Sequence, residues 1–460
     1  MLHRTLREHL DAFQSELEGS GRWLPGFVRR GFERFLECGI LEHGFVRAQC
    51  EDCRRNRFVA FSCKTRGLCP SCGGRRMSET AAHLVDSVFP HVSVRQWVLS
   101  VPIELRYRMA FDAALCSQVL DSMVRQIGRH NRLRAKRLYG LESVKWLQTG
   151  SVTFIQRADS GLRLNVHFHS LVLDGVYQIR GPLQAPTFLE LPPPTEAEVQ
   201  KVALGIRRRV LALLGEASEL DGLADAEPLL AECAVASVTE RVATGAGRER
   251  WLKRVKRGSL ARRASTPERC FNAEGFSLHA NVAIEADDRR GLEKLCRYVA
   301  RPPVANQRLE ELSDGRIAYR LKRAWSDGTT EVVYEPHELI AKLVPLMPPP
   351  RAHQVRYHGI LAPAASYREF VVPAAGGDGE PDAARRRNYR WAELMQRVFE
   401  HEVLECPECG GRMRIVATVT EPRTIRAILR SVGLAADSPP RGSATARRQM
   451  PLRFEMASIG

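Results

Sequence analysis

The sequence LNVHFHSLVL, residues 164–173, decides the fold, because it reads as a buried strand that carries two histidines. Side chains two positions apart on a strand point to the same face, so His167 and His169 project together while Val166 and Phe168 face a core. Two adjacent imidazoles can hold one divalent cation and leave coordination positions open for a phosphate oxygen. The stretch therefore predicts a central strand with a Mg2+ or Mn2+ site on one face.

A His-x-His pair can also be plain packing, but the apolar flanks argue against a surface pair, and buried imidazoles need partners. A third metal ligand is then expected. Gln156 is near in sequence, but a turn centred near residues 159–160 would leave it several residues from the histidines. His279, in the separate strand pattern FSLHANVAI (residues 276–284), is the better candidate, and an ordinary strand histidine is the alternative.

Helix and strand patterns alternate around this stretch. Their order suits an α+β fold with a palm-like, mostly antiparallel sheet and helices on one side. The expected strands cover residues 92–101, 151–157, 162–173, 276–284, 317–320 and 329–334, the expected helices cover residues 107–139, 195–216 and 288–301, and residues 178–194 read as a proline-rich loop.

The helix pattern DRRGLEKLCRYVAR, residues 288–301, places Tyr298 at the edge of an apolar stripe. Lys294, Arg297 and Arg301 lie close to it in sequence, and such cations favour a phenolate and can hold a phosphate. A lone tyrosine at a helix edge is more often a packing residue. Next to a metal site, however, Tyr298 becomes a candidate nucleophile, since a metal can polarise a phosphodiester and stabilise the leaving oxygen.

Two Cys-x2-Cys pairs, Cys50 with Cys53 and Cys69 with Cys72, follow each other closely in the first 80 residues. Each pair can place two thiolates on one metal, so the spacing predicts a single structural Zn2+ with no open position for chemistry. Cys63 is a fifth candidate that could replace one of the four.

Cys406 and Cys409 form another Cys-x2-Cys pair near the end of the chain, with His401 close by. No further pair follows it. Half a zinc site and a glycine-rich turn without metal therefore both remain open.

A formal net charge of +16 over 460 residues implies a polyanionic partner. Residues 241–263 are strongly basic and include an aromatic side chain that can stack on an unpaired base. A charge run is usually a solvated face, but this one lies between the strands assigned to the metal site, which favours contact with single-stranded DNA. The expected DNA-binding residues are Trp251, Lys253, Arg254, Lys256 and Arg257.

The sequence lacks the run of about 18 to 20 apolar residues that a membrane-spanning helix needs. Its N-terminus reads as an amphipathic helix without the apolar core of a secretory signal. We therefore expect a cytoplasmic protein without a membrane partner, in which clustered cysteines bind metal rather than form disulfides.

Six segments carry a family resemblance: CEDC…FSCKTRGLCPSCGGRRM, RQWVLSVP, TFIQRADSGLRLNVHFHSLVLDGVY, FSLHANVAIEADDRRGLEKLCRYVARPP, RYHGILAP and ECPECGGRMRIVA. Together they resemble the insertion sequence 91 family of transposases, which are His-hydrophobe-His (HUH) endonucleases. The resemblance implies an HUH core and rolling-circle transposition of single-stranded DNA at element ends and targets, in the bacterial nucleoid. It implies that His167 and His169 bind the metal and that Tyr298 joins the 5′ phosphate and frees a 3′ hydroxyl.

One departure concerns the nucleophile. Founding members carry two tyrosines four residues apart on this helix, whereas Lys294 and Pro302 flank Tyr298 at that distance here, which points to a single-tyrosine branch. Two other functions stay open: a rolling-circle replication initiator or relaxase with the same chemistry, and a non-catalytic zinc protein that regulates by binding DNA.

The expected domain organisation has five parts. They are a helical region with a four-cysteine zinc site at residues 1–80, an HUH core at 90–345 with a basic insertion at about 178–275, a linker region at 346–390, a small C-terminal module with Cys-x2-Cys at 391–434, and a disordered tail at 435–460.

Overall fold

The computed structural model describes residues 1–182, 184–216, 226–257, 268–373, 391–399 and 403–434. Residues 374–390 of the expected linker region at 346–390, the tail at 435–460 and His401 therefore lie outside the described residues. Residues 355–359 of that region form a strand that pairs with residues 150–154 and are not a linker. In the part of the chain that is described, no helix is both long and apolar enough to cross a membrane.

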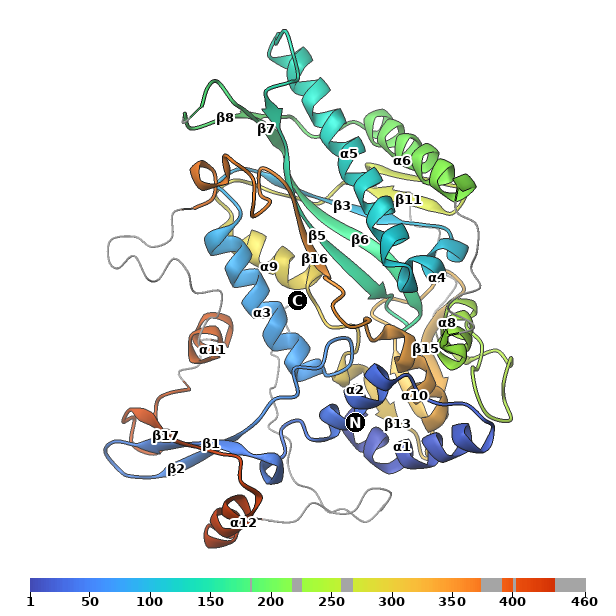
Figure 1. Cartoon of the computed structure of the whole chain (residues 1–460), viewed down its shortest axis with the longest axis vertical. Coiled ribbons are helices and arrows are strands. Elements are labelled where there is room, and N and C mark those ends of the chain that lie inside the picture. Colours follow the sequence, from blue (N-terminus) through green and yellow to red (C-terminus); the bar gives the residue numbers. More distant parts are fainter. Residues whose placement is uncertain (183, 217–225, 258–267, 374–390, 400–402, 435–460) are drawn as a thin grey trace.

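A seven-stranded antiparallel sheet forms the centre of the molecule, with the histidine strand inside it (Figure 1). Six strands follow each other in the sheet, and a short seventh, β12 (Ala283–Ile284), pairs with β3 beside β11. The order of the six is β10 (Cys270–Ala273), β11 (Phe276–His279), β3 (Val94–Ser100), β6 (Leu164–Leu173), β5 (Gly150–Ala158) and β16 (Val355–Gly359). The expected α+β class and mostly antiparallel sheet are confirmed.

The register between β5 and β6 differs from the expected one. Gln156 lies opposite His167, and Phe154 lies opposite His169, with a bulge before Ala158. The turn spans residues 159–163 instead of centring near 159–160, because the Asp159 carboxylate accepts hydrogen bonds from the main-chain N–H groups of residues 161 and 163. The expectation that Gln156 lies several residues from the histidines is therefore wrong.

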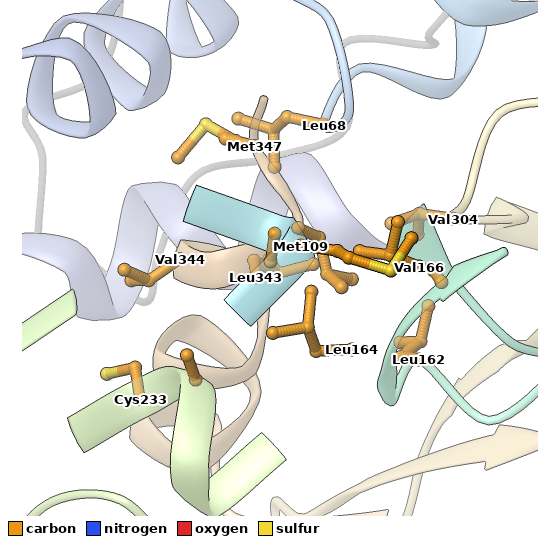
Figure 2. Packing of buried hydrophobic residues seen from close by; sticks show 14 of the residues in the cluster. Leu68, Met109, Leu162, Leu164, Val166, Cys233, Val304, Leu343, Val344 and Met347 are labelled. Carbon is orange, nitrogen blue, oxygen red and sulfur yellow. The ribbon is translucent and has the colours of Figure 1, made fainter. Parts of the chain in front are cut away.

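Helices cover both faces of this sheet, whereas the sequence suggested one. On one face, Val166 and Phe168 of β6 pack into the largest core, part of which is seen in Figure 2. On the other, Phe154 and Leu171 pack with apolar side chains of two helices. The first face carries α4 (Ile103–Phe111), α5 (Ala113–Leu138), α6 (Glu196–Glu216) and α8 (Pro228–Thr239), and the second carries α3 (Pro70–Ser87) and α9 (Arg289–Val299).

Two smaller antiparallel sheets flank the central one. A four-stranded sheet packs with the N-terminal helices and α10 in the largest core. A three-stranded sheet includes a strand where the sequence suggested only a proline-rich loop. The four-stranded sheet has the order β13 (Leu309–Glu311), β14 (Ile317–Arg320), β15 (Thr329–Tyr334) and β9 (Lys253–Lys256), and the helices beside it are α1 (Leu2–Gly19), α2 (Gly26–Leu36) and α10 (Pro336–Leu343). The three-stranded sheet has the order β4 (Leu147–Gln148), β7 (Gly175–Gln178) and β8 (Thr187–Glu190).

A further three-stranded sheet brings distant parts of the sequence together. Its order is β17 (Met413–Val419), β1 (Phe45–Cys50) and β2 (Asn56–Ala60), so a strand near the end of the chain pairs with one near its beginning (Figure 1). The helices α11 (Trp391–Phe399) and α12 (Pro422–Ser431) precede and follow β17. The C-terminal module is thus built onto the N-terminal zinc region.

Candidate active site and metal centres

The two histidines of β6 lie side by side on the face that α9 covers. Their ring centroids are 5.0 Å apart, with an angle of 62° between the ring planes. His167 Nδ1 donates a hydrogen bond to the main-chain oxygen of Asn165 at 2.7 Å. This fixes the tautomer and leaves His167 Nε2 with a free lone pair, the form in which imidazole binds a metal.

His169 lies deeper, with 5 % of its surface exposed. Its Nδ1 is 2.8 Å from Nε2 of Gln96, a neighbour on β3, while its own Nε2 is buried without a hydrogen-bond partner. In this orientation the Gln96 amide nitrogen donates to Nδ1 of His169. If the Gln96 amide is turned by 180°, its oxygen accepts from the Nδ1–H of His169, and Nε2 of His169 is free to bind a metal. An unpartnered buried nitrogen is costly, and a cation would satisfy it.

Burial lowers the pKa of both imidazoles. For His169 the fall is large, and the neighbouring His167 and Arg301 add to it. Both rings are therefore neutral near pH 7, which is the protonation state that a metal ligand requires.

The structure does not bring His279 close to His167 and His169. His279 is on β11 and Val98 of β3 stands between it and His169 in the same row of the sheet. Among the described residues, no His, Cys, Asp or Glu joins the pair in a group of three with ligand atoms within 4.8 Å of one another. The expectation that His279 is the third ligand is therefore not supported, and Gln156, directly opposite His167, is better placed.

Tyr298 lies over the histidine pair. Its ring centroid is 6.3 Å from that of His169, and 41 % of its surface is exposed. The helix α9 holds it there: the Asp288 carboxylate caps the N-terminus by accepting from Gly291 N–H at 2.7 Å, and the expected apolar stripe is buried. Near the other end, Gln156 Nε2 donates to the main-chain oxygen of Val299 at 2.6 Å.

Two cations stack on the tyrosine ring. The Arg301 guanidinium carbon is 4.4 Å from the ring centroid and Lys322 Nζ is 5.3 Å from it. Lys322 lies between β14 and β15 in the second sheet, so no local pattern in the sequence could associate it with Tyr298. Together the two side chains give the tyrosine a positive surrounding that suits a phosphate.

The cysteines form two groups, which corrects the expected single site. Cys69 and Cys72, at the start of α3, join Cys38 and Cys63, with Sγ–Sγ distances of 3.6 to 3.7 Å among the hydrogen-bonded pairs. Four thiolates on zinc at about 2.3 Å would be about 3.8 Å apart, so the group fits a tetrahedral Zn2+. Cys63 is thus a member of the site, and Cys38 was missed because it stands outside any Cys-x2-Cys pair.

Cys50 and Cys53 belong to the second group, where they meet Cys406 and Cys409. Spacing alone could not show this, because it says how each pair turns but not which pairs face each other. The partner of Cys406 and Cys409 lies more than 350 residues earlier in the chain.

Comparison with known families matches two regions of the chain. Residues 5–101 match the transposase zinc-binding domain of insertion sequence 91 elements, and residues 150–369 match a transposase family with the short name Y2_Tnp. The chain belongs to the insertion sequence 91 family of transposases. No curated protein and no solved structure matches it. The zinc-binding match supports structural zinc in the transposase, and its family indicates that it acts on DNA.

The basic segment of the transposase is only partly free to meet DNA. Arg254 on β9 forms ion pairs with Glu240 and Asp327, and Lys256 and Arg257 lie 3.6 Å from carboxylates of Asp327 and Glu331. Their side chains range from 28 % exposed for Arg254 to 59 % and 70 % for the other two. The part of this run at residues 258–267 lies outside the described residues.

The segment is nevertheless connected to the tyrosine. Arg254 lies 5.3 Å from the ring of Trp325, in the same loop as Lys322, which faces Tyr298. Trp251 is 58 % exposed and carries Arg241 over its ring at 4.7 Å. Lys253 and Arg257 remain the best candidates there for phosphate contact, while Arg254 also stabilises the sheet.

Proposed function

We propose that the transposase nicks and rejoins single-stranded DNA by rolling-circle transposition, with Tyr298 as the nucleophile and an HUH-type palm core as its scaffold. The observation that carries the proposal is the edge-to-face contact of Tyr298 with His169, at 6.3 Å between ring centroids, with Arg301 and Lys322 over the tyrosine ring. A nucleophile, a candidate metal site and two phosphate-binding cations thus occupy one place, although they come from three separate parts of the chain.

The metal would be held by Nε2 of His167 and of His169. Gln156 replaces His279 as the proposed third ligand, because its side chain lies on the same face of the sheet as the histidines and its Nε2 donates to Val299, which leaves its oxygen as the atom that can bind a metal. When bound, Mg2+ or Mn2+ would polarise the scissile phosphate and stabilise charge on the leaving oxygen. The unpartnered Nε2 of His169 is the structural feature that fits such an ion.

The chain's own residues account for the remaining steps. Arg301 and Lys322 attract a phosphodiester to the tyrosine. The phenolic oxygen of Tyr298 attacks phosphorus, a Tyr298–phosphate bond forms and the bond to the 3′ oxygen breaks. Over the whole step, the phenolic proton ends on the 3′ oxygen, which leaves a 3′ hydroxyl and a 5′-phosphotyrosine.

The proposal is tested with a labelled single-stranded oligonucleotide that carries an element end. Wild-type protein should form an SDS-resistant adduct with Mg2+ or Mn2+ and none in EDTA, whereas Tyr298→Phe should bind the DNA but form no adduct. Tyr139→Phe is a matched control, because Tyr139 is 42 % exposed and lies at the end of α5, away from the histidines.

An adduct that persists in Tyr298→Phe would assign the nucleophile elsewhere. Full adduct formation in EDTA would remove the metal from the proposal. DNA binding without any adduct in the wild type would favour a regulator that binds DNA without cutting it.

A further inference from the structure

We propose that the transposase holds a second structural zinc, bound by Cys50, Cys53, Cys406 and Cys409, which joins the strands β1 and β2 near the start of the sequence to β17 near its end. The four sulfurs lie within 4.8 Å of one another, with Cys50 to Cys409 at 3.5 Å and Cys53 to Cys406 at 3.6 Å. These distances approach the value of about 3.8 Å that a tetrahedral zinc–tetrathiolate centre requires. The zinc-binding domain match ends at residue 101, before two of these ligands.

The two Cys-x2-Cys segments have the same backbone construction. The N–H of Cys50 donates to the oxygen of Arg55 at 2.9 Å, and the N–H of Cys406 donates to the oxygen of Gly411 at 2.7 Å, five residues on in both cases. The residue before each acceptor is left-handed, Arg54 with φ 60° and Gly410 with φ 71°. Each of these Cys-x2-Cys turns is a zinc knuckle, and two knuckles that face each other are the arrangement found in zinc ribbons.

The two knuckles are in close contact. A Cβ atom on Gly411 would overlap the Asp52 carboxylate and lie 3.0 Å from Cys50 Sγ. Glu51 N–H also donates to the main-chain oxygen of Arg412 at 2.9 Å, across the two segments. The close approach of the two Cys-x2-Cys segments is therefore fixed by backbone contacts and does not depend on side-chain rotamers alone.

Among the described residues, the small sheet around this group has only a small apolar core. Its apolar clusters hold four buried side chains each, Ala48, Cys50, Cys406 and Met413 beside the cysteines, and Phe45, Val419, Ile425 and Leu429 at the far end. Cores of this size rarely sustain a fold without a disulfide or a metal. A zinc bound here would contribute folding energy directly.

Zinc binding by these four cysteines would also affect the candidate active site. Between the central fold and this sheet, Arg397 of α11 forms ion pairs with Asp86 of α3 and Glu293 of α9, the tyrosine helix. A zinc that holds β17 on β1 therefore keeps the C-terminal segment beside α9. This inference does not depend on the nicking chemistry, and its test does not measure nicking.

The experiment counts zinc in the full-length protein by elemental mass spectrometry. Wild type should carry two zinc ions per chain, one for each cysteine group. Cys409→Ala should carry one, whereas Cys409→His should keep two, because imidazole also binds zinc. With Co2+ in place of zinc, the visible bands of Cys409→His should shift as one of four sulfurs is replaced by nitrogen. Cys270→Ala, half-buried and outside both groups, is the matched control and should keep two.

Thiol alkylation of the native wild type gives an answer even where Cys409→Ala does not fold. Cys50, Cys53, Cys406 and Cys409 should react only after zinc is removed by a chelator. One zinc per wild-type chain, with Cys406 and Cys409 alkylated in the native protein, would overturn the inference. So would a disulfide among these four residues in the intact mass.

Discussion

His167 and His169 differ in the group that is hydrogen-bonded to Nδ1 of the imidazole. His167 donates to a main-chain carbonyl, which no side-chain substitution removes. His169 depends for the same task on the side chain of Gln96. The orientation of His169 is therefore the part of the candidate metal site that a single substitution outside the ligands can disturb.

Replacing Gln96 with alanine should weaken Mn2+ binding by about 10- to 100-fold, because ligand imidazoles lose affinity when their hydrogen-bond partner is removed. Titration of the protein with Mn2+, followed by electron paramagnetic resonance of the free ion, measures this directly. Gln148→Ala, on β4 in another sheet, is the control and should leave the affinity unchanged. Equal affinity in both variants would show that Gln96 does not orient a ligand.

The sequence allowed some single residues to be predicted and not others. His167, His169 and Tyr298 could be proposed for the candidate site because each belongs to a local periodicity, a strand face or a helix edge. Lys322 could not, because it reaches Tyr298 from another sheet. His279 was chosen over Gln156 because the turn was placed about two residues too early, and the register of a hairpin follows its turn.

Among the elements, α9 carries the tyrosine, and α3 is its main support. The two helices pack together, and Gly73 on α3 lies against Pro302, four residues after Tyr298. Because α3 begins at Cys69 and Cys72 of the first cysteine group, that group is connected to the tyrosine through a single helix.

A methyl group at Gly73 should disturb this contact. Its Cβ would lie 2.6 Å from Cβ of Pro302, so α3 or the segment after α9 must move. We expect Gly73→Ala to lower the free energy of unfolding by about 1 to 3 kcal/mol and to slow adduct formation. Chemical denaturation and adduct kinetics measure the two effects.

Gly74→Ala is the matched control at the next position of the same helix. A Cβ atom there meets nothing within 4 Å, and alanine favours a helix over glycine by up to about 1 kcal/mol. It should be neutral or stabilising and leave adduct kinetics unchanged. Equal behaviour of the two variants would mean that the contact with Pro302 does not position the tyrosine helix.

Most elements could be predicted from hydrophobic periodicity, including β6 and α9. The helices on the second face could not be, because periodicity shows that an element has an apolar face but not which side of a sheet receives it. The pairing of β17 with β1 is similar: strands 350 or more residues apart carry no local signal for each other.

For the whole molecule, the net charge of +16 suits DNA, but its distribution is uneven. Several cations of the basic segment are neutralised by nearby acids, so the expected set of DNA-binding residues divides into two roles. Arg254 joins Glu240 and Asp327 and supports the second sheet, whereas Lys253 and Arg257 are exposed, although Arg257 also pairs with Glu331.

Replacing Lys253 and Arg257 together with glutamine should weaken binding of single-stranded DNA for all sequences alike, since phosphate contacts carry no base information. Two lost contacts should flatten the plot of log affinity against log salt by about 1.4. Fluorescence anisotropy across a salt series measures the slope. The control replaces Arg208 and Arg209, exposed on α6 across the central sheet from Tyr298. If the slope of log affinity against log salt is the same in the two double variants, the basic segment does not contact DNA and only makes the surface more soluble.

The central claim is that Tyr298 becomes covalently joined to DNA, and peptide mapping of the adduct tests it most directly. The trapped complex is digested with nuclease and protease, and the peptide that carries the residual nucleotide is sequenced by tandem mass spectrometry. We expect the nucleotide phosphate on Tyr298. A phosphate on any other residue would contradict the claim.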